Sequence, residues 1–154
     1  YTTGLLNSIQ MGGNGATLGL GILLFFLAKS KRYKQLSRVA IVPQIFNIGE
    51  PLLFGIPIML NPLLFIPYML GVIANTCIAY GSVAIGLCAR FTGVNPSWTM
   101  PGILQGILTC SVPWQGAVLQ IVILAVDMLI WYPFVKMIDK QAVEEENNAV
   151  SEAA

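Results

Sequence analysis

The amino-acid sequence predicts an all-α integral membrane protein, built from transmembrane helices and from re-entrant or broken helical hairpins. Hydrophobic residues make up 56% of the chain and charged residues 10%, whereas a soluble domain has about 25% charged residues. No charged residue occurs in positions 51–89, a run well beyond the roughly 20 apolar residues that a membrane span needs. We therefore expect the chain to reside in a lipid bilayer.

Three apolar segments are predicted to cross the bilayer: residues 13–28, 62–89 and 117–137. The first is short for a span. Trp131 and Tyr132 lie near the end of the third, where aromatic side chains are enriched at the membrane–water interface. We therefore expect both to be interfacial aromatics.

Two further apolar segments are broken by proline and glycine. Residues 39–61 contain three prolines, two glycines and Glu50, and residues 98–114 contain two prolines and two glycines. Each proline removes a backbone hydrogen-bond donor, and irregular backbone at membrane depth is tolerated only beside protein or a water-filled cavity. Both segments are predicted to be broken helices or re-entrant hairpins. The spacing of Gly102 and Gly106 indicates close helix packing.

The charged residues suggest which side of the membrane each connection faces. Five Lys or Arg residues lie between Lys29 and Arg38, which is typical of a cytoplasmic loop or of a surface helix that binds anionic headgroups. If only three segments cross, this stretch and the C-terminal tail share the cytoplasmic side, and Lys136 and Lys140 agree with that. If residues 98–114 also cross, the tail lies outside.

The organisation predicted is a membrane region over residues 1–138 and a polar cytoplasmic tail over residues 139–154. The tail carries three consecutive glutamates, and we expect it to be disordered. The chain begins at Tyr1 on Gly-rich sequence and has no signal-peptide pattern. We interpret it as a piece of a longer protein.

The composition also limits the functions to consider. The net charge of +1 gives no reason to expect a nucleic-acid partner. The chain has no histidine and no C-x-x-C pair, so no metal site, redox dithiol or cofactor is expected, and Cys77, Cys88 and Cys110 are interpreted as small buried hydrophobic residues. There is no P-loop motif for ATP hydrolysis.

Two acidic residues and one tryptophan are the candidates for function. Glu50 lies in the most broken segment, where unwound backbone and a carboxylate together suit a polyhydroxylated ligand, and there it can act as a general base. The alternative is a helix break whose acid pairs with a basic residue. Asp127 lies within an unbroken apolar span, and an interhelical hydrogen bond is the favoured role. Trp98 suits either sugar stacking or interfacial anchoring.

Four sequence blocks, in this order, resemble enzyme IIC of the bacterial phosphotransferase system, in the lactose, cellobiose and diacetylchitobiose group. They are Gly-Gly-Asn-Gly-Ala-Thr-Leu at 12–18, Asn-Ile-Gly-Glu-Pro-Leu-Leu-Phe-Gly-Ile-Pro-Ile-Met-Leu-Asn-Pro at 47–62, Trp-Thr-Met-Pro at 98–101 and Trp-Tyr-Pro-Phe-Val-Lys at 131–136. The Glu-Pro block is the specific one. The blocks cover nearly the whole chain and match the C-terminal half of such proteins.

The resemblance implies a permease in the bacterial inner membrane that binds a β-linked disaccharide, which a phosphorylated enzyme IIB then phosphorylates. It assigns Glu50 to the accepting hydroxyl and Trp98 to the sugar site, and we expect Asn47 to add a polar contact. It also implies a homodimer formed mainly through an N-terminal half that is missing here. Gly49 stands where the family commonly has asparagine, and the family's catalytic histidine lies upstream of this sequence.

Two other classes remain open at this point. An ion-coupled secondary sugar transporter also uses broken helices and membrane carboxylates, and uptake driven by an ion gradient would identify it. A non-transporting membrane scaffold would use its glycines and acids for packing only, and it would tolerate Glu50→Ala. Group translocation is the function we expect.

Overall fold

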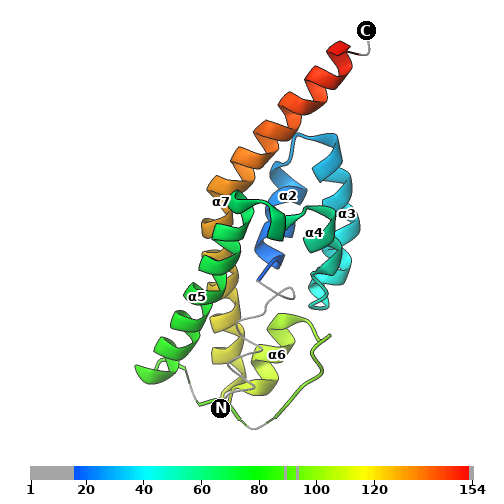
Figure 1. The fold of residues 1–154 in the computed structure, drawn as a ribbon. Helices are drawn as coiled ribbons and strands as arrows, with labels where there is room; N and C mark the ends of the chain where they lie inside the picture. Colours follow the sequence, from blue (N-terminus) through cyan, green and yellow to red (C-terminus); the bar gives the residue numbers. More distant parts are fainter. Residues whose placement is uncertain (1–15, 89, 93, 153–154) are drawn as a thin grey trace.

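The computed structural model describes residues 16–88, 90–92 and 94–152. The described secondary structure is helical, apart from one isolated bridge between Phe91 and Cys110. The helices are α2 (Leu18–Leu27), α3 (Lys31–Ile45), α4 (Glu50–Gly55), the 3₁₀ helix η1 (Ile58–Leu60), α5 (Pro62–Ala84), α6 (Gly102–Thr109) and α7 (Pro113–Glu152), arranged as in Figure 1. The predicted all-α class is therefore confirmed.

Among the described residues, two helices are long and apolar enough to cross a membrane. They are α5, with 23 residues, and the apolar part of α7. At about 1.5 Å per residue, α5 extends roughly 34 Å, which matches the hydrocarbon thickness of about 30 Å. Helix α5 lies within the second predicted span, residues 62–89, and the third predicted span, residues 117–137, lies within α7. The first predicted span begins in residues that lie outside the described part, and its described helix, α2, has ten residues.

Helix α7 is the central element, and α2, α5 and α6 all pack against it (Figure 1). One core cluster joins Leu64 near the start of α5 to Val135 and Ile138 of α7. A second cluster joins Val83 near the end of α5 to Leu119 near the start of α7. The two helices are therefore antiparallel, and the two clusters lie at opposite ends of the pair.

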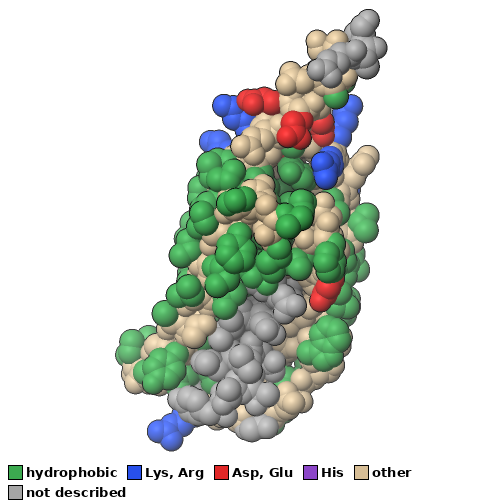
Figure 2. Space-filling model, in the orientation of Figure 1, with side chains coloured by type: hydrophobic (Ala, Val, Ile, Leu, Met, Phe, Trp, Pro, Cys, Tyr) green, Lys and Arg blue, Asp and Glu red, His purple; other side chains and the backbone are tan. Residues whose placement is uncertain are grey.

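The outer surface is apolar along its middle and charged at one end. Figure 2 shows hydrophobic side chains covering the middle of the visible face, with acidic and basic side chains gathered near the C-terminal end of the chain. Large apolar side chains stay exposed on several helices, among them Phe26, Phe54, Ile73 and Leu129. Such a surface is expected where side chains face lipid rather than water.

The breaks predicted in residues 39–61 and 98–114 are present. In the first, α3, α4 and η1 follow one another as separate short helices. In the second, α6 has eight residues, about 12 Å of helix, which is too short to cross a bilayer. One boundary was wrong: α3 runs continuously through Arg38 and Val39, because no helix breaker precedes Pro43 and the helix ends soon after it.

The prediction of a disordered tail is wrong. Helix α7 continues without a break to Glu152, because the sequence after Met137 is rich in good helix formers and contains neither glycine nor proline. Two tail carboxylates also bind the N-terminal end of α3. Asp139 accepts from the backbone N–H of Lys29 and Ser30 at 3.0 Å, and Glu146 accepts from the Ser30 hydroxyl at 2.6 Å.

The same contacts place the basic stretch and the tail at one end of the molecule. Glu146 also accepts from the backbone N–H groups of Lys31 and Arg32, at 3.3 and 3.2 Å. Two N–H groups and one hydroxyl from the start of α3 thus have Glu146 as their partner on α7, in addition to the two N–H groups that Asp139 accepts from. Carboxylates are favoured at a helix N-terminus because the N–H groups there have no intrahelical acceptor.

The interfacial role predicted for Trp131 is also wrong. Its side chain is fully buried in the core cluster with Leu20, Leu24 and Val135. Trp131 faces this cluster because α2 packs on the same side of α7, and α7 continues well past it. Tyr132, the next residue, is half exposed.

Candidate functional site

The segment that carries Glu50 is shaped by the end of α3. The backbone N–H groups of Phe46 and Ile48 both donate to the carbonyl of Pro43 at 3.0 Å. Between them, Asn47 has a φ of 62°, a left-handed conformation that asparagine tolerates better than most residues. The chain thus turns sharply after α3, and Glu50 becomes the first residue of α4.

Glu50 is exposed at this turn. Within the described residues, no hydrogen bond or ion pair engages its carboxylate, and Lys140–Glu144 is the ion pair found there. The pairing of Glu50 with a basic residue, which was the alternative interpretation of the break, is not seen in this part of the chain. The carboxylate therefore has its acceptor capacity available for a ligand hydroxyl.

Asn47 is held by a residue that sequence reasoning did not select. Its side-chain amide donates to Oε1 of Gln105 at 3.1 Å, across 58 positions of sequence. Gln105 lies in α6 and is 1% exposed. The first predicted broken segment is thus joined to the second by a buried hydrogen bond between side chains.

Gln105 in turn holds the loop that contains Trp98. Its Nε2 donates to the carbonyls of Ser97 and Trp98, at 3.1 and 3.2 Å. The Trp98 side chain remains 66% exposed, so the backbone is fixed while the indole is available. The structure therefore links Asn47 to Trp98 through one glutamine, whereas among the described residues no hydrogen bond or ion pair joins the Glu50 side chain to either. A glutamine among aliphatic residues of a short apolar helix was the sequence signal for Gln105.

Asp127 has the interhelical role that we predicted. It is fully buried on α7, and its Oδ2 accepts from the side-chain amide of Asn75 on α5 at 3.1 Å. Its Oδ1 has no hydrogen-bond partner. Gly19 of α2 passes close by, since a Cβ placed there would lie 3.1 Å from Asp127 Cβ. The residue therefore sits where three helices meet, away from Glu50 in α4.

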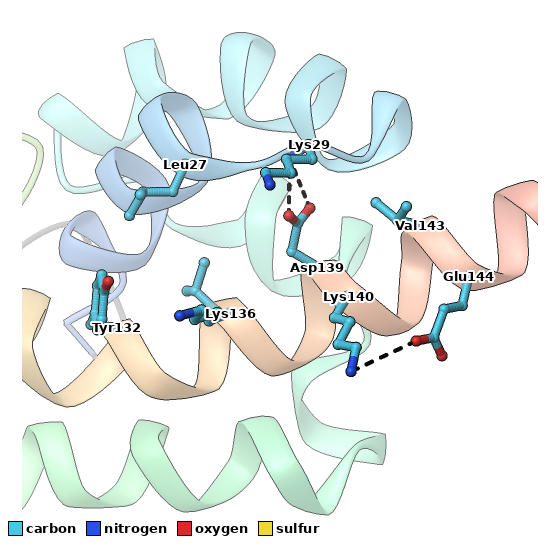
Figure 3. A pocket seen from close by; sticks show the side chains of 9 residues that line it. Leu27, Lys29, Tyr132, Lys136, Asp139, Lys140, Val143 and Glu144 are labelled. Carbon is cyan, nitrogen blue, oxygen red and sulfur yellow. Dashed lines mark hydrogen bonds and ion pairs between the residues drawn. The ribbon is translucent and has the colours of Figure 1, made fainter.

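Cavities lined by described residues occur elsewhere in the fold. One, of about 510 Å³, lies between the end of α2 and the polar part of α7. Figure 3 shows its charged side chains: Asp139 points to the backbone of Lys29, and Lys140 faces Glu144. Another, of about 520 Å³, is lined mainly by apolar residues of α5, of the connection after it and of α7, together with Cys88, Ser82 and Gln115. Neither is lined by Glu50, Asn47 or Trp98. In the described chain, no three His, Cys, Asp or Glu residues gather as they would around a metal ion.

Comparison with known proteins identifies relatives of the chain. The family model "Phosphotransferase system, EIIC" matches residues 1–71. The chain is 41% identical to the lichenan permease IIC component of Bacillus subtilis (strain 168), over 91% of this chain and 31% of that protein. It is 44% identical to the cellobiose-specific EIIC component of Geobacillus stearothermophilus, over 90% of this chain and 31% of that protein.

A solved structure is similar as well. The match is to the crystal structure of the transporter ChbC, the IIC component from the N,N'-diacetylchitobiose-specific phosphotransferase system, with a TM-score of 0.88 and 41% identity. It covers 91% of this chain and 32% of that one. The chain thus spans about a third of the length of these relatives, and over about nine tenths of its own length it is similar to enzyme IIC components of the phosphotransferase system.

Proposed function

We propose that this chain forms the sugar-binding part of a phosphotransferase-system permease, which binds a β-linked disaccharide and presents it for phosphorylation by enzyme IIB. The observation that carries the proposal is the buried link from Asn47 through Gln105 to the Trp98 backbone. This link joins a polar residue of the Glu-Pro segment and the backbone of a residue with an exposed indole to the same glutamine. Relatives of the chain that are named for lichenan and cellobiose also support the proposal.

Trp98, Asn47 and Glu50 each have a distinct role in this proposal. Trp98 offers its exposed indole face to a sugar ring, as aromatic side chains do in binding sites that combine apolar surfaces with a few polar groups. Asn47 contributes a polar contact. Glu50 accepts a hydrogen bond from the sugar hydroxyl that will be phosphorylated, and as a general base it raises that oxygen's nucleophilicity. The phosphoryl group comes from the partner, so no residue of this chain carries it.

The proposed orientation places in the cytoplasm the end of the molecule where Asp139 and Glu146 of α7 bind the start of α3. Five basic residues lie at this end of the molecule: Lys29, Lys31, Arg32, Lys34 and Arg38. Positive residues beside membrane spans favour the cytoplasmic side. The membrane region then covers residues 1–138, and residues 139–154 are cytoplasmic. Dimerisation would use parts of the permease outside this chain.

The experiment that tests the proposal uses the full-length permease reconstituted in vesicles. Uptake of radiolabelled cellobiose, diacetylchitobiose and lactose is measured with and without phosphorylated enzyme IIB, and the internal sugar is tested for phosphate. Phosphosugar that depends on the partner and is lost in Glu50→Gln supports the proposal. Unmodified sugar that accumulates on an ion gradient would instead identify a secondary transporter, and phosphorylation at the wild-type rate in Glu50→Gln would remove the role of Glu50.

A further inference from the structure

Cys88 and Cys110 meet in space, although 22 positions separate them in the sequence. Their Sγ atoms are 3.2 Å apart, and the two residues are 5% and 4% exposed. A disulfide bond has an S–S distance of about 2.05 Å, so the two atoms need to approach by only about 1.2 Å. The sequence has no C-x-x-C motif and did not predict this pair, because the two cysteines are brought together only by the fold.

The backbone around both cysteines holds them in register. Phe91 and Cys110 form an antiparallel bridge. Ser111 donates to the carbonyl of Arg90 from its backbone N–H at 3.3 Å and from its hydroxyl at 2.6 Å. Thr92 donates from its backbone N–H to the carbonyl of Thr109 at 2.7 Å. The short contact between sulfurs is therefore set by neighbouring backbone and does not depend on side-chain orientation alone.

The pair lies at the end of the molecule opposite the basic stretch. Both cysteines belong to the core cluster that contains Val83 and Leu119, at the end of α5 and the start of α7. The helix is continuous from Pro113 to Asp139, a rise of about 39 Å at 1.5 Å per residue. A helix of that length can cross the hydrocarbon region, which is about 30 Å thick, and such a crossing would place the two ends on different sides of the bilayer.

We propose that Cys88 and Cys110 are a redox modification site, in which an external disulfide oxidises them to a disulfide on the outer side of the membrane. The side rests on the orientation proposed above, whereas the pairing itself does not depend on sugar transport. Disulfides form and persist in oxidising, extracytoplasmic surroundings. This bond would close the base of the segment between residues 88 and 110, which carries Trp98 and Gln105.

The chemistry is a thiol–disulfide exchange in two steps. The deprotonated sulfur of one cysteine attacks the external disulfide R–S–S–R, forming a mixed disulfide and releasing one thiol R–SH. The second cysteine then attacks the protein sulfur of the mixed disulfide and releases the other R–SH. The two cysteines thereby lose two electrons and two protons, and the external disulfide gains both.

The exchange is expected to be slow in the folded protein. Cys88 lies in the connection after α5, and burial, with a contribution from its hydrogen bond to Cys110, raises the pKa of its thiol to about 12. Because the thiolate is the attacking species, little of it is present near neutral pH. The incubation with oxidant therefore has to be long, and samples should be taken as a time course.

Trypsin gives a direct assay of the bond. Arg90 is the one Lys or Arg between positions 39 and 135, so cleavage separates a peptide of residues 39–90, with Cys77 and Cys88, from a peptide of residues 91–136, with Cys110. Full-length permease in detergent is incubated with oxidised glutathione, its remaining thiols are blocked with N-ethylmaleimide, and it is unfolded and digested. We expect the two peptides to be linked, and dithiothreitol to separate them.

Cysteine variants decide which residues form the link. The linked pair should persist in Cys77→Ser and disappear in Cys88→Ser. If both cysteines of Cys77→Ser are alkylated after oxidation, or if the link persists in Cys88→Ser, the proposed pairing is wrong. The side is tested in sealed right-side-out vesicles, where oxidised glutathione added outside should produce the link. A link that forms only with glutathione trapped inside would overturn the outward location. None of these readouts depends on sugar uptake.

Discussion

Asn47 donates a hydrogen bond from its side-chain amide to Oε1 of Gln105 over 3.1 Å, and both residues are buried. The two residues belong to the two segments that proline and glycine break, which are far apart in the sequence. Gln105 donates from its Nε2 to two backbone carbonyls of the loop that precedes α6. A single side chain thus couples the turn before Glu50 to the backbone of Trp98.

Replacing Gln105 should therefore weaken both folding and sugar binding. Gln105→Leu removes an acceptor for Asn47 and a donor to the carbonyls of Ser97 and Trp98, and each buried polar group left without a partner costs about 1–3 kcal/mol. We expect a lower melting temperature and weaker cellobiose binding, measured by calorimetry on full-length permease. Leu104→Ala, at a half-exposed neighbour in α6, is the control. If cellobiose binding in Gln105→Leu equals that of the control, Gln105 does not position the site.

The hydrogen bonds that Asp139 and Glu146 of α7 accept should keep the residues at the start of α3 well ordered. Asp139→Ala removes the acceptor for the backbone N–H groups of Lys29 and Ser30, and the loss of a helix-capping side chain typically costs about 0.5–2 kcal/mol. Hydrogen exchange of these amides, read by mass spectrometry, should accelerate. Glu144→Gln is the control, because its contact with Lys140 is exposed and 4.0 Å long, and such pairs contribute little.

Glu146 should make the stability of this end depend on acid. Its pKa lies below the ordinary value of 4.5, first because the Ser30 hydroxyl donates to it and then because the backbone N–H of Arg32 does. A carboxylate with a lowered pKa in the folded state contributes stability above its unfolded pKa, and that contribution is lost as the pH falls through the folded value. The melting temperature should therefore drop below about pH 4.5.

The variant Glu146→Gln isolates this effect, because glutamine does not titrate. Its melting temperature should fall less steeply with acid than that of the wild type, whereas Glu144→Gln should keep the wild-type slope. Equal slopes in all three proteins would show that other carboxylates determine the acid response.

Asp127 should act through hydrogen bonding and not through its charge. Asp127→Asn keeps an oxygen that can accept from the Asn75 amide, so it should fold and support partner-dependent uptake. Asp127→Leu removes the acceptor, and interhelical hydrogen bonds in membranes contribute about 0.6 kcal/mol on average and up to about 1.7. Thermal unfolding and vesicle uptake are the measurements. Loss of uptake in Asp127→Asn without loss of stability would favour ion coupling through the carboxylate.

The fold class and the breaks in the chain were predictable because they depend on local sequence. A long uncharged run requires an apolar environment, and the prolines and glycines around Glu50 interrupt any helix. The continuation of α7 past Met137 was missed. Composition alone does not show that Asp139 and Glu146 accept hydrogen bonds from the residues at the start of α3. The burial of Trp131 was missed as well, because composition does not show that α2 packs on the same side of α7.

The candidate site shows the same division. Glu50 and Trp98 were selected from their residue types and their broken surroundings. The link between the two broken segments was not predictable, because Asn47 and Gln105 are 58 positions apart and only the packing of α6 brings them together. The pairing of Cys88 with Cys110 is likewise a product of the fold.

The crossing of α6 and α7 depends on two facing glycines. A Cβ at Gly106 would lie 2.7 Å from the carbonyl oxygen of Gly116, and a Cβ at Gly116 would clash with the carbonyl of Gly106. Because backbone atoms cannot move aside as a side chain does, Gly106→Ala should push the helices apart and displace Gln105, the neighbouring residue. We expect a melting temperature lower than that of the wild type, together with weaker cellobiose binding.

Gly81 of α5 provides the matched control, because a Cβ there would meet nothing within 4 Å. Alanine in a helix is favoured over glycine by about 0.5–1 kcal/mol, so Gly81→Ala should be neutral or stabilising in the same thermal unfolding assay. Opposite signs in the two variants would locate the effect at the α6–α7 contact. If Gly106→Ala were as stable as Gly81→Ala, the close approach of α6 to α7 would be wrong, and with it the placement of Gln105 against Asn47.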